Sequence, residues 1–240
     1  MNKQLSFEYG NATIPFEVEY SPRRRTVQIA VQGPGKVMVT APAGRSDQEL
    51  LDVVSKKGRW ITQKLFMMKS MRLEPVFREM VSGETFPYLG RGYRLDLQMD
   101  EDAKKPSISL KAGQIKMHSK SMDQEYLRSH LIAWYRSKAE ELISDRVQYY
   151  SGKMGVIPKT VNIKDQKKRW GSCTTTGSLY FNWRSIMAPA PVIDYIVVHE
   201  LCHLLELKHS TRFWSLLRAV MPEFEARKQW LKENGVKLDV

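Results

Sequence analysis

The 240-residue sequence contains only two cysteines, Cys173 and Cys202. So few thiols exclude a disulfide-stapled fold and fit a reducing compartment. No apolar run approaches the ~18 residues that a membrane-spanning helix needs, and residues 1–6 lack the hydrophobic region of a signal peptide. We therefore expect a cytoplasmic protein that does not engage a membrane, in which both cysteines are packed thiols.

Linkers rich in glycine, serine or proline are also missing, and no internal repeat is visible. The hydrophobic fraction of 42% and the length suit one large globular domain or two small ones. We place a boundary where a long amphipathic pattern begins. It divides the chain into a β-rich N-terminal region with one long helix, residues 1–120, and a second domain, residues 121–240.

The N-terminal region is dominated by period-2 alternation of apolar residues, which is typical of half-buried strands. A Gly-Pro-Gly turn at residues 33–35 separates two of these strands. Ser46 and Glu49 form a capping-box pattern that predicts the start of a helix. No catalytic constellation is present, so we expect this region to contact a substrate or partner. The expected elements are strands over 14–20, 27–31 and 37–41, one helix over 46–65, and hairpins over 88–95 and 108–117.

The C-terminal domain is dominated by helical periodicity. Asp123 is positioned to cap a long amphipathic helix that ends near Gly152 or Gly155. The other expected elements are a strand over 161–163, a hairpin over 169–183, a helix containing residues 193–204, a helix capped by Ser210 and a helix restarted by Pro222.

The strongest chemical signal is the motif of His199, Glu200 and His203. Histidines four apart lie on one face of a helix, so these two can bind a single metal ion. Glu200 is rotated by roughly 100° from His199, where it can take a proton from water without binding the metal. Zinc with three protein ligands keeps a fourth position for water and lowers the pKa of that water from about 15.7 towards 7. The alternative is a helix whose histidines are satisfied within the core.

A third ligand is needed, and His209 is the candidate because the chain is expected to turn just after it. In a continuing helix, Glu206 would lie roughly 10 Å from His199 along the axis, too far to complete the site. Glu223 and Glu225 fall in the first turn of another helix, where acidic residues are expected for dipole reasons alone. The sequence therefore predicts one Zn²⁺ bound by His199, His203 and His209.

The formal net charge of +12 favours polyanionic partners. Basic residues cluster at residues 23–25, 56–59 and 164–169. Each cluster alone is more readily explained as a solvated surface. Together they keep nucleic acid as a partner, beside a protein or peptide substrate.

Four short motifs of the C-terminal domain match a known pattern. They are Trp170-Gly171-Ser172-Cys173, Asn182-Trp183, His199-Glu200-Leu201-Cys202-His203, and His209-Ser210 with Phe213-Trp214. In these residues the sequence resembles the YgjP-like zinc metallopeptidases and, more widely, SprT-like proteases and their DNA-protein-crosslink-repair relatives. The resemblance is dense over residues 124–234 and looser before. It implies an α+β fold with a zincin-like catalytic domain, a small sheet plus a metal-binding helix, preceded by the β-rich region.

The same resemblance implies zinc ligands at His199, His203 and His209 and a general base at Glu200. One departure concerns Glu206, since zinc peptidases with this histidine spacing carry glycine at that place. A residue with a side chain takes a left-handed turn only at a cost. The helix is therefore expected to run further before bending, or to bend at residues 207–208.

The hairpin around Trp170 has two interpretations. Its apolar residues are typical of packed strands, whereas Gly171 allows another backbone to approach closely. The second interpretation makes Trp170, Gly171 and Ser172 a substrate-binding edge that pairs with an extended peptide. The predicted function is a zinc-dependent peptidase; the rival is a basic nucleic-acid-binding protein with structural zinc, or a protease recruited to DNA.

Overall fold

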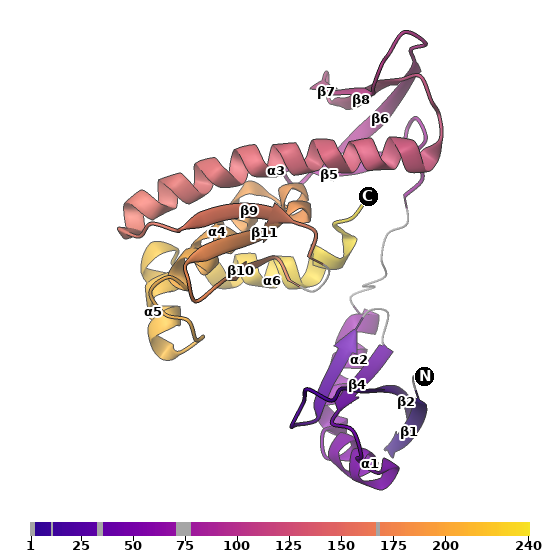
Figure 1. Cartoon of the computed structure of the whole chain (residues 1–240), viewed down its shortest axis with the longest axis vertical. Helices are drawn as coiled ribbons and strands as arrows, with labels where there is room; N and C mark the ends of the chain where they lie inside the picture. The colour runs from indigo at the N-terminus through magenta and orange to yellow at the C-terminus, as the bar shows by residue number, and fades with distance from the viewer. Residues whose placement is uncertain (1–2, 11, 33–35, 71–77, 167–168) are drawn as a thin grey trace. The chain divides into compact units, whose positions relative to one another are not determined.

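The computed structural model describes residues 3–10, 12–32, 36–70, 78–166 and 169–240 (Figure 1). It divides the chain into two compact units, Met1–Pro75 and Val76–Val240. Each unit has its own hydrophobic core, and no described core residue belongs to both. The turn expected at residues 33–35 and two residues of a basic cluster, Lys167 and Lys168, lie outside the described residues.

The first unit is a four-stranded sheet with two helices. The strand order is β1-β2-β4-β3, with parallel pairing between β2 and β4 and antiparallel pairing at both edges. Alternation along the strands buries Phe7, Phe16 and Val39 in one core with Leu50 and Val54 of the first helix. The elements are β1 (Lys3–Tyr9), β2 (Ala12–Tyr20), β3 (Gln28–Gln32), β4 (Lys36–Ala41), α1 (Asp47–Ser55) and α2 (Gly58–Ser70).

The second unit begins with another four-stranded sheet, of order β5-β6-β8-β7, followed by a 31-residue helix. The Asp123 carboxylate accepts a hydrogen bond from the Tyr126 N–H at the start of this helix, and Gly155 ends it in the left-handed conformation. Both helix ends were expected. The elements are β5 (Thr85–Tyr88), β6 (Arg91–Met99), β7 (Ser107–Lys111), β8 (Gln114–Ser119) and α3 (Gln124–Met154).

The rest of the second unit is a small three-stranded sheet, of order β10-β11-β9, with helices beside it. Helix α3 contacts β9, the short helix η1 and α4, which ties this part to the same core. The α+β class and the expected pairing of a small sheet with the histidine-bearing helix are confirmed. The elements are β9 (Thr160–Lys164), β10 (Gly171–Cys173), β11 (Ser178–Asn182), η1 (Trp183–Met187), α4 (Ala190–Cys202), α5 (Thr211–Val220), α6 (Phe224–Asn234) and η2 (Gly235–Lys237).

The division of the chain differs from the expected boundary at residue 120. The second sheet does not belong with the first, because Phe86, Leu95 and Ile115 are buried in one core with Leu127 and Leu131 of α3. The unit that contains the histidines therefore includes the hairpins predicted over 88–95 and 108–117. Those hairpins themselves are confirmed, and the second pairs Ile108↔Met117 as expected.

The two four-stranded sheets have the same topology, so the fold contains an internal repeat that the sequence did not reveal. At matching places their strands have nine, five and six residues. The connection at residues 21–27 also matches that at residues 100–106: Ser21 N–H donates to Ala41 O at 2.9 Å, and Asp100 N–H donates to Ser119 O at 3.0 Å. We call β1 to α1 the first module, and β5 to the first turns of α3 the second module.

Buried positions correspond between the modules as well. Phe7 and Phe86 are one equivalent pair, and both are buried. Most pairs keep apolar character without keeping the residue, which is why the repeat was not visible in the sequence. The other equivalent buried pairs are Phe16 with Leu95, Val39 with Met117, Leu50 with Leu127, and Val54 with Leu131.

The single helix expected over residues 46–65 is wrong, although its capping box at Ser46 and Glu49 is present. The helix stops at Ser55, and a second one starts at Gly58. A Cβ at residue 58 would come within 2.3 Å of the Tyr9 ring, so glycine is required where β1 packs on this junction. No helix in the described part of the chain is long and apolar enough to cross a membrane.

Candidate active site

Helix α4 carries His199, is capped at its end by His203, and is held firmly at its start. Prolines at the cap and in the first turn set its direction. The β5-β6 turn is bonded just before it, with Leu89 N–H donating to Ile186 O at 2.9 Å and Gly90 N–H donating to Met187 O at 3.0 Å. Gly90 has φ +78° and lies so close to Pro189 that a Cβ would be 2.9 Å from its Cα. The second module therefore supports the helix that presents His199 and His203.

The middle of α4 is anchored to α3 by a partly buried ion pair. Asp194 accepts two hydrogen bonds of 2.6 Å from Arg146 and a third of 3.1 Å from the Tyr150 hydroxyl. A bidentate pair of this kind fixes both distance and orientation. It fixes the helix one turn before the first histidine.

The chain turns directly after the second histidine. Helix α4 ends at Cys202, so the longer helix is not seen; turns at residues 203–205 are followed by a bend at residues 207–208, as the other alternative expected. The His203 Nδ1 lies 3.1 Å from the Glu206 backbone oxygen, which places the proton on Nδ1 and leaves Nε2 as the ligand atom. Glu206 therefore contacts His203 through its backbone oxygen only, and its carboxylate accepts a hydrogen bond from the Lys208 N–H at 3.3 Å.

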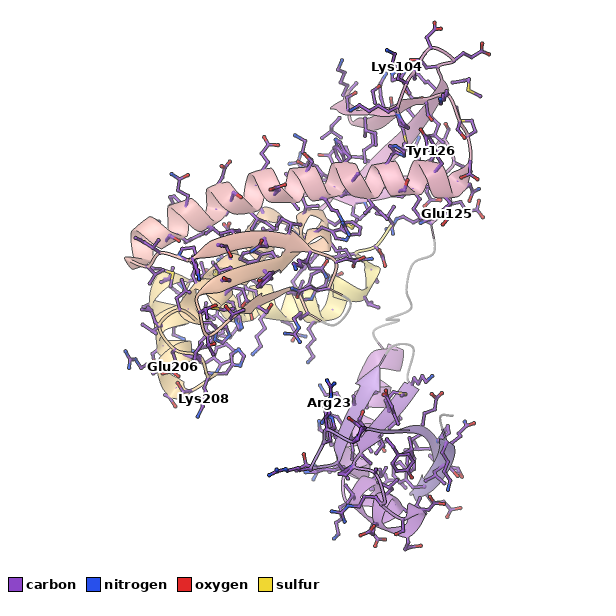
Figure 2. The ribbon with its side chains drawn as sticks, in the orientation of Figure 1. Arg23, Lys104, Glu125, Tyr126, Glu206 and Lys208 are labelled. Carbon is purple, nitrogen blue, oxygen red and sulfur yellow. The ribbon has the colours of Figure 1, made fainter. Side chains whose placement is uncertain are left out.

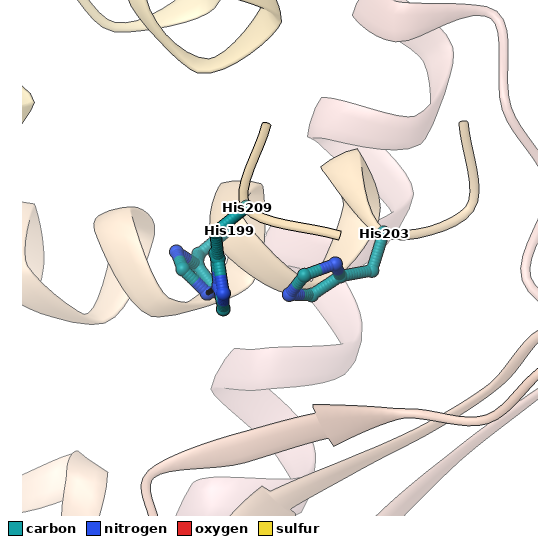
Figure 3. Close-up of side chains that lie close together, drawn as sticks. All are labelled: His199, His203 and His209. Atoms are coloured by element: carbon teal, nitrogen blue, oxygen red, sulfur yellow. Dashed lines mark hydrogen bonds between the residues drawn. The ribbon is translucent and has the colours of Figure 1, made fainter. Parts of the chain in front are cut away.

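This turn brings His209 back to the helix. Its Nε2 is 2.9 Å from the Nε2 of His199 (Figure 3). The three histidines offer ligand nitrogens that all lie within 4.8 Å of one another. The predicted histidine set is therefore assembled in space.

Aromatic side chains pack against the three imidazoles. Phe213 is fully buried, and its ring centroid lies 4.9 Å from His199, 4.6 Å from His203 and 4.8 Å from His209. Trp214 stacks on His209 at 5.5 Å. Ser210 caps the helix that presents both aromatics, as expected, by accepting a hydrogen bond from the Phe213 N–H.

Burial makes protonated imidazole unfavourable in this cluster. The pKa of His199 is lowered to about 3 by burial and then by the neighbouring positive charges. Burial also lowers the pKa of His209. Neutral imidazoles are the form that binds metals.

Glu200 lies beside the histidines and is only 5% exposed. Burial raises its pKa to about 8, although the positive charge of Arg169 acts in the opposite direction. Its Oε2 has no hydrogen-bond partner among the described residues. A buried carboxylate oxygen without a partner is costly in a purely structural role and points to a functional one.

Gly171 in β10 is what makes room for this carboxylate. A Cβ at residue 171 would lie 2.6 Å from both Cγ and Oε1 of Glu200. Gly171 was expected to allow the approach of another backbone, and in the structure the group that approaches it is the Glu200 side chain.

Two open cavities flank Glu200 and His199. One, of about 320 Å³, includes the other two histidines, Gly171, Ser172 and Cys173 in its lining. The other, of about 210 Å³, includes Trp170 and Tyr195. Arg169 lines both.

The predicted substrate-binding residues are thus split between the two cavities. Ser172 reaches only the histidine cavity and Trp170 only the other, whereas Gly171 lines both. The Trp170 ring packs on the chain at Gly235, where a Cβ would be 2.7 Å from its Cζ2. Trp170 therefore supports the strand by packing, while β10 remains an edge strand paired with β11 alone.

The comparisons with known proteins agree with this geometry. A family model described as YgjP-like, metallopeptidase domain, matches residues 25–234. The chain belongs to the YgjP-like family. It is a metallopeptidase, as the resemblance implied.

Two solved structures are also similar to this YgjP-like chain. The metallopeptidase zymogen abylysin of Pyrococcus abyssi is 19% identical, with a TM-score of 0.36, and the match covers 40% of this chain and 97% of abylysin. The zymogen jannalysin of Methanocaldococcus jannaschii is 24% identical, with a TM-score of 0.33, covering 38% of this chain and 91% of jannalysin. None of the curated proteins compared matches the chain.

Sequence reasoning about this YgjP-like site missed Arg169 and Tyr195. Tyr195 precedes His199 by four residues, so helical periodicity alone places it on the same face of α4. Arg169 stands directly before the Trp170 motif, but nothing in the sequence relates it to Glu200. The two cysteines are free, and burial raises the pKa of Cys202 to about 12.

Proposed function

We propose that this metallopeptidase is zinc-dependent and that Glu200 is its general base. The observation that carries the proposal is the convergence of three imidazoles beside a buried carboxyl group whose Oε2 has no partner among the described residues. No structural role accounts for that combination, because unpaired buried polar atoms destabilise a fold.

The donor set fits zinc held by His199, His203 and His209. Three imidazole nitrogens leave a fourth tetrahedral position open, which distinguishes catalytic from structural zinc sites. The nearby thiols are poor competitors, since burial raises the pKa of both Cys173 and Cys202. When bound, zinc would supply a Lewis acid that acidifies water and polarises a peptide carbonyl.

Glu200 accepts the proton of the attacking water and returns it to the leaving amine. Its contact with Gly171 fixes the carboxylate at the junction of the two cavities. Bound zinc would favour the ionised carboxylate, against the effect of burial, and would so make Glu200 available as a base at neutral pH.

Arg169 is proposed to stabilise the negative charge that develops on the carbonyl oxygen. It is the cationic side chain that lines both cavities, and it makes no hydrogen bond or ion pair through its side chain with another described residue. Donors that face the charge developing in the transition state are typically the largest single contribution to catalysis.

An extended peptide is proposed to pair with the outer edge of β10 at Gly171 and Ser172. The other edge of β10 is already paired with β11, so the outer edge offers unpaired backbone groups next to Glu200. Strand addition at an exposed edge binds peptides through their backbone and accepts many sequences.

The test is Glu200→Gln, with Glu206→Gln as a matched control of the same chemistry on the exposed turn. We expect Glu200→Gln to bind about one zinc per chain, as the parent does, and to lose hydrolysis of an unfolded protein. Glu206→Gln should keep both. Full hydrolysis by Glu200→Gln at normal zinc content would disprove the general-base role, and a lowered zinc content would make Glu200 a ligand.

A further inference from the structure

The internal repeat supplies a reference against which the first module can be compared. The second module serves the active site, because its β5-β6 turn supports the start of α4 and its helix packs in the same core as α4. The first module contributes no described residue to that core. Its surface is therefore free to serve another purpose.

The connection between the second and third strand of each module follows the same backbone path. Arg24 N–H donates to Ser21 O at 3.2 Å in the first, and Ala103 N–H donates to Asp100 O at 3.2 Å in the second. Turns and bends fall at the same places in both connections. The path thus does not require any particular charge on its side chains.

The charges of the two connections nevertheless differ strongly. Residues 21–27 carry Arg23, Arg24 and Arg25 and no acidic residue. Residues 100–106 begin with three acidic residues before two lysines, and Asp102 stands where Arg23 stands. Since the fold tolerates either composition, the three consecutive arginines are not explained by stability.

The positive charges of the three arginine side chains are also not balanced by acidic partners. All three are exposed, and none forms a hydrogen bond or ion pair with a described residue. Other basic residues of the first unit are paired, as in Lys3 with Asp47 at 2.7 Å and Arg45 with Glu49 at 2.8 Å, although Lys56, Lys57 and Arg59 are not paired with a described residue. In Figure 2 the side chains around Arg23 extend away from the ribbon.

We propose that residues 21–27 of the first module bind the phosphate backbone of a nucleic acid. Guanidinium groups match phosphate oxygens in bidentate geometry better than ammonium groups do. Tyr20, which is 39% exposed and directly precedes the connection, offers a ring on which a base can stack. An anionic membrane is a poorer match, because the connection exposes no large apolar side chain that could enter the bilayer surface.

This binding is independent of the metal site, and the repeat provides a matched control. R23A/R24A and K104A/K105A each remove two exposed positive charges, and they do so from equivalent connections. Fluorescence anisotropy with a labelled mixed-sequence DNA of about 30 nucleotides, single-stranded and duplex, measures the affinity as salt is raised from about 50 mM. R23A/R24A should weaken binding about tenfold or more at 0.1 M salt and lower the slope of log K against log salt by about 2. K104A/K105A should bind as the parent does.

R23K/R24K keeps the charge and should keep most of the binding, which separates loss of contact from misfolding. Glu200→Gln should bind DNA normally, so that a failure of the catalytic proposal can be told apart from a failure of the DNA-binding proposal. The inference is overturned if the parent does not bind at low salt, or if the two alanine pairs weaken binding equally. Tighter binding to vesicles containing one third phosphatidylglycerol than to either DNA would also overturn it.

Discussion

Gly171→Ala isolates the contact between the edge strand and the proposed base. The added Cβ would lie 2.6 Å from Cγ and Oε1 of Glu200, whereas ordinary contacts begin at 3.4 Å. The carboxylate or the strand must therefore move by about 0.8 Å. Gly171 is not in the left-handed region, so alanine itself fits the backbone. The three atoms nearest to this Cβ all belong to Glu200, so zinc affinity should be unchanged.

Displacing a reacting group by about 1 Å lowers turnover on the order of 100-fold, which corresponds to about 2.7 kcal/mol of activation free energy. We expect a loss of this size in kcat/KM for an unfolded protein substrate. The melting temperature should fall only by the amount that adding one methyl group to a packed site causes. Gly152→Ala is the control, since nothing lies within 4 Å of its Cβ and its backbone is helical. Unchanged kcat/KM in Gly171→Ala, at normal zinc content, would refute the argument that this contact positions the base.

Three further changes test other parts of the site. His209→Ala should lower zinc affinity sharply in competition with a chelator, while Glu206→Gln should not; the reverse result would contradict the three-histidine site. Arg169→Ala should lower kcat by about 100-fold or more with little change in KM, as for loss of an oxyanion donor, and an effect on KM alone would reassign Arg169 to substrate binding. Asp194→Ala should lower the free energy of unfolding in urea by roughly 2 kcal/mol, less than for a fully buried pair because its arginine partner is a third exposed; no change would mean that the ion pair does not hold α4.

The features predicted correctly from the sequence are those specified locally. Ser46, Asp123 and Ser210 cap their helices because a side-chain oxygen and its N–H partner lie three residues apart. The spacing of His199 and His203 fixes a common helix face, and alternation fixed the strand register of the second hairpin. None of these features needs information from distant parts of the chain.

The features that were missed depend on distant contacts. Glycine is needed at the start of α2 because Tyr9 of another element packs there, and the place of Arg169 depends on how β10 packs on α4. The repeat was hidden because burial was preserved while residue identities were not. Likewise, the division after residue 75 follows from which helix covers the second sheet, and no local composition marks it.

The turn after α4 has a kinetic consequence. Of the three proposed zinc ligands, His199 lies in a helix that is anchored at its start and middle and His203 caps the end of that helix, whereas His209 follows a short non-helical segment tied back by the His203 to Glu206 hydrogen bond. When one ligand of a metal site lies on a less firmly held segment, the ion exchanges stepwise, and that ligand dissociates from the ion first. The residence time of zinc should therefore be governed by the backbone path of residues 204–208, so that substitutions that disturb this path accelerate metal exchange while helix α4 stays intact.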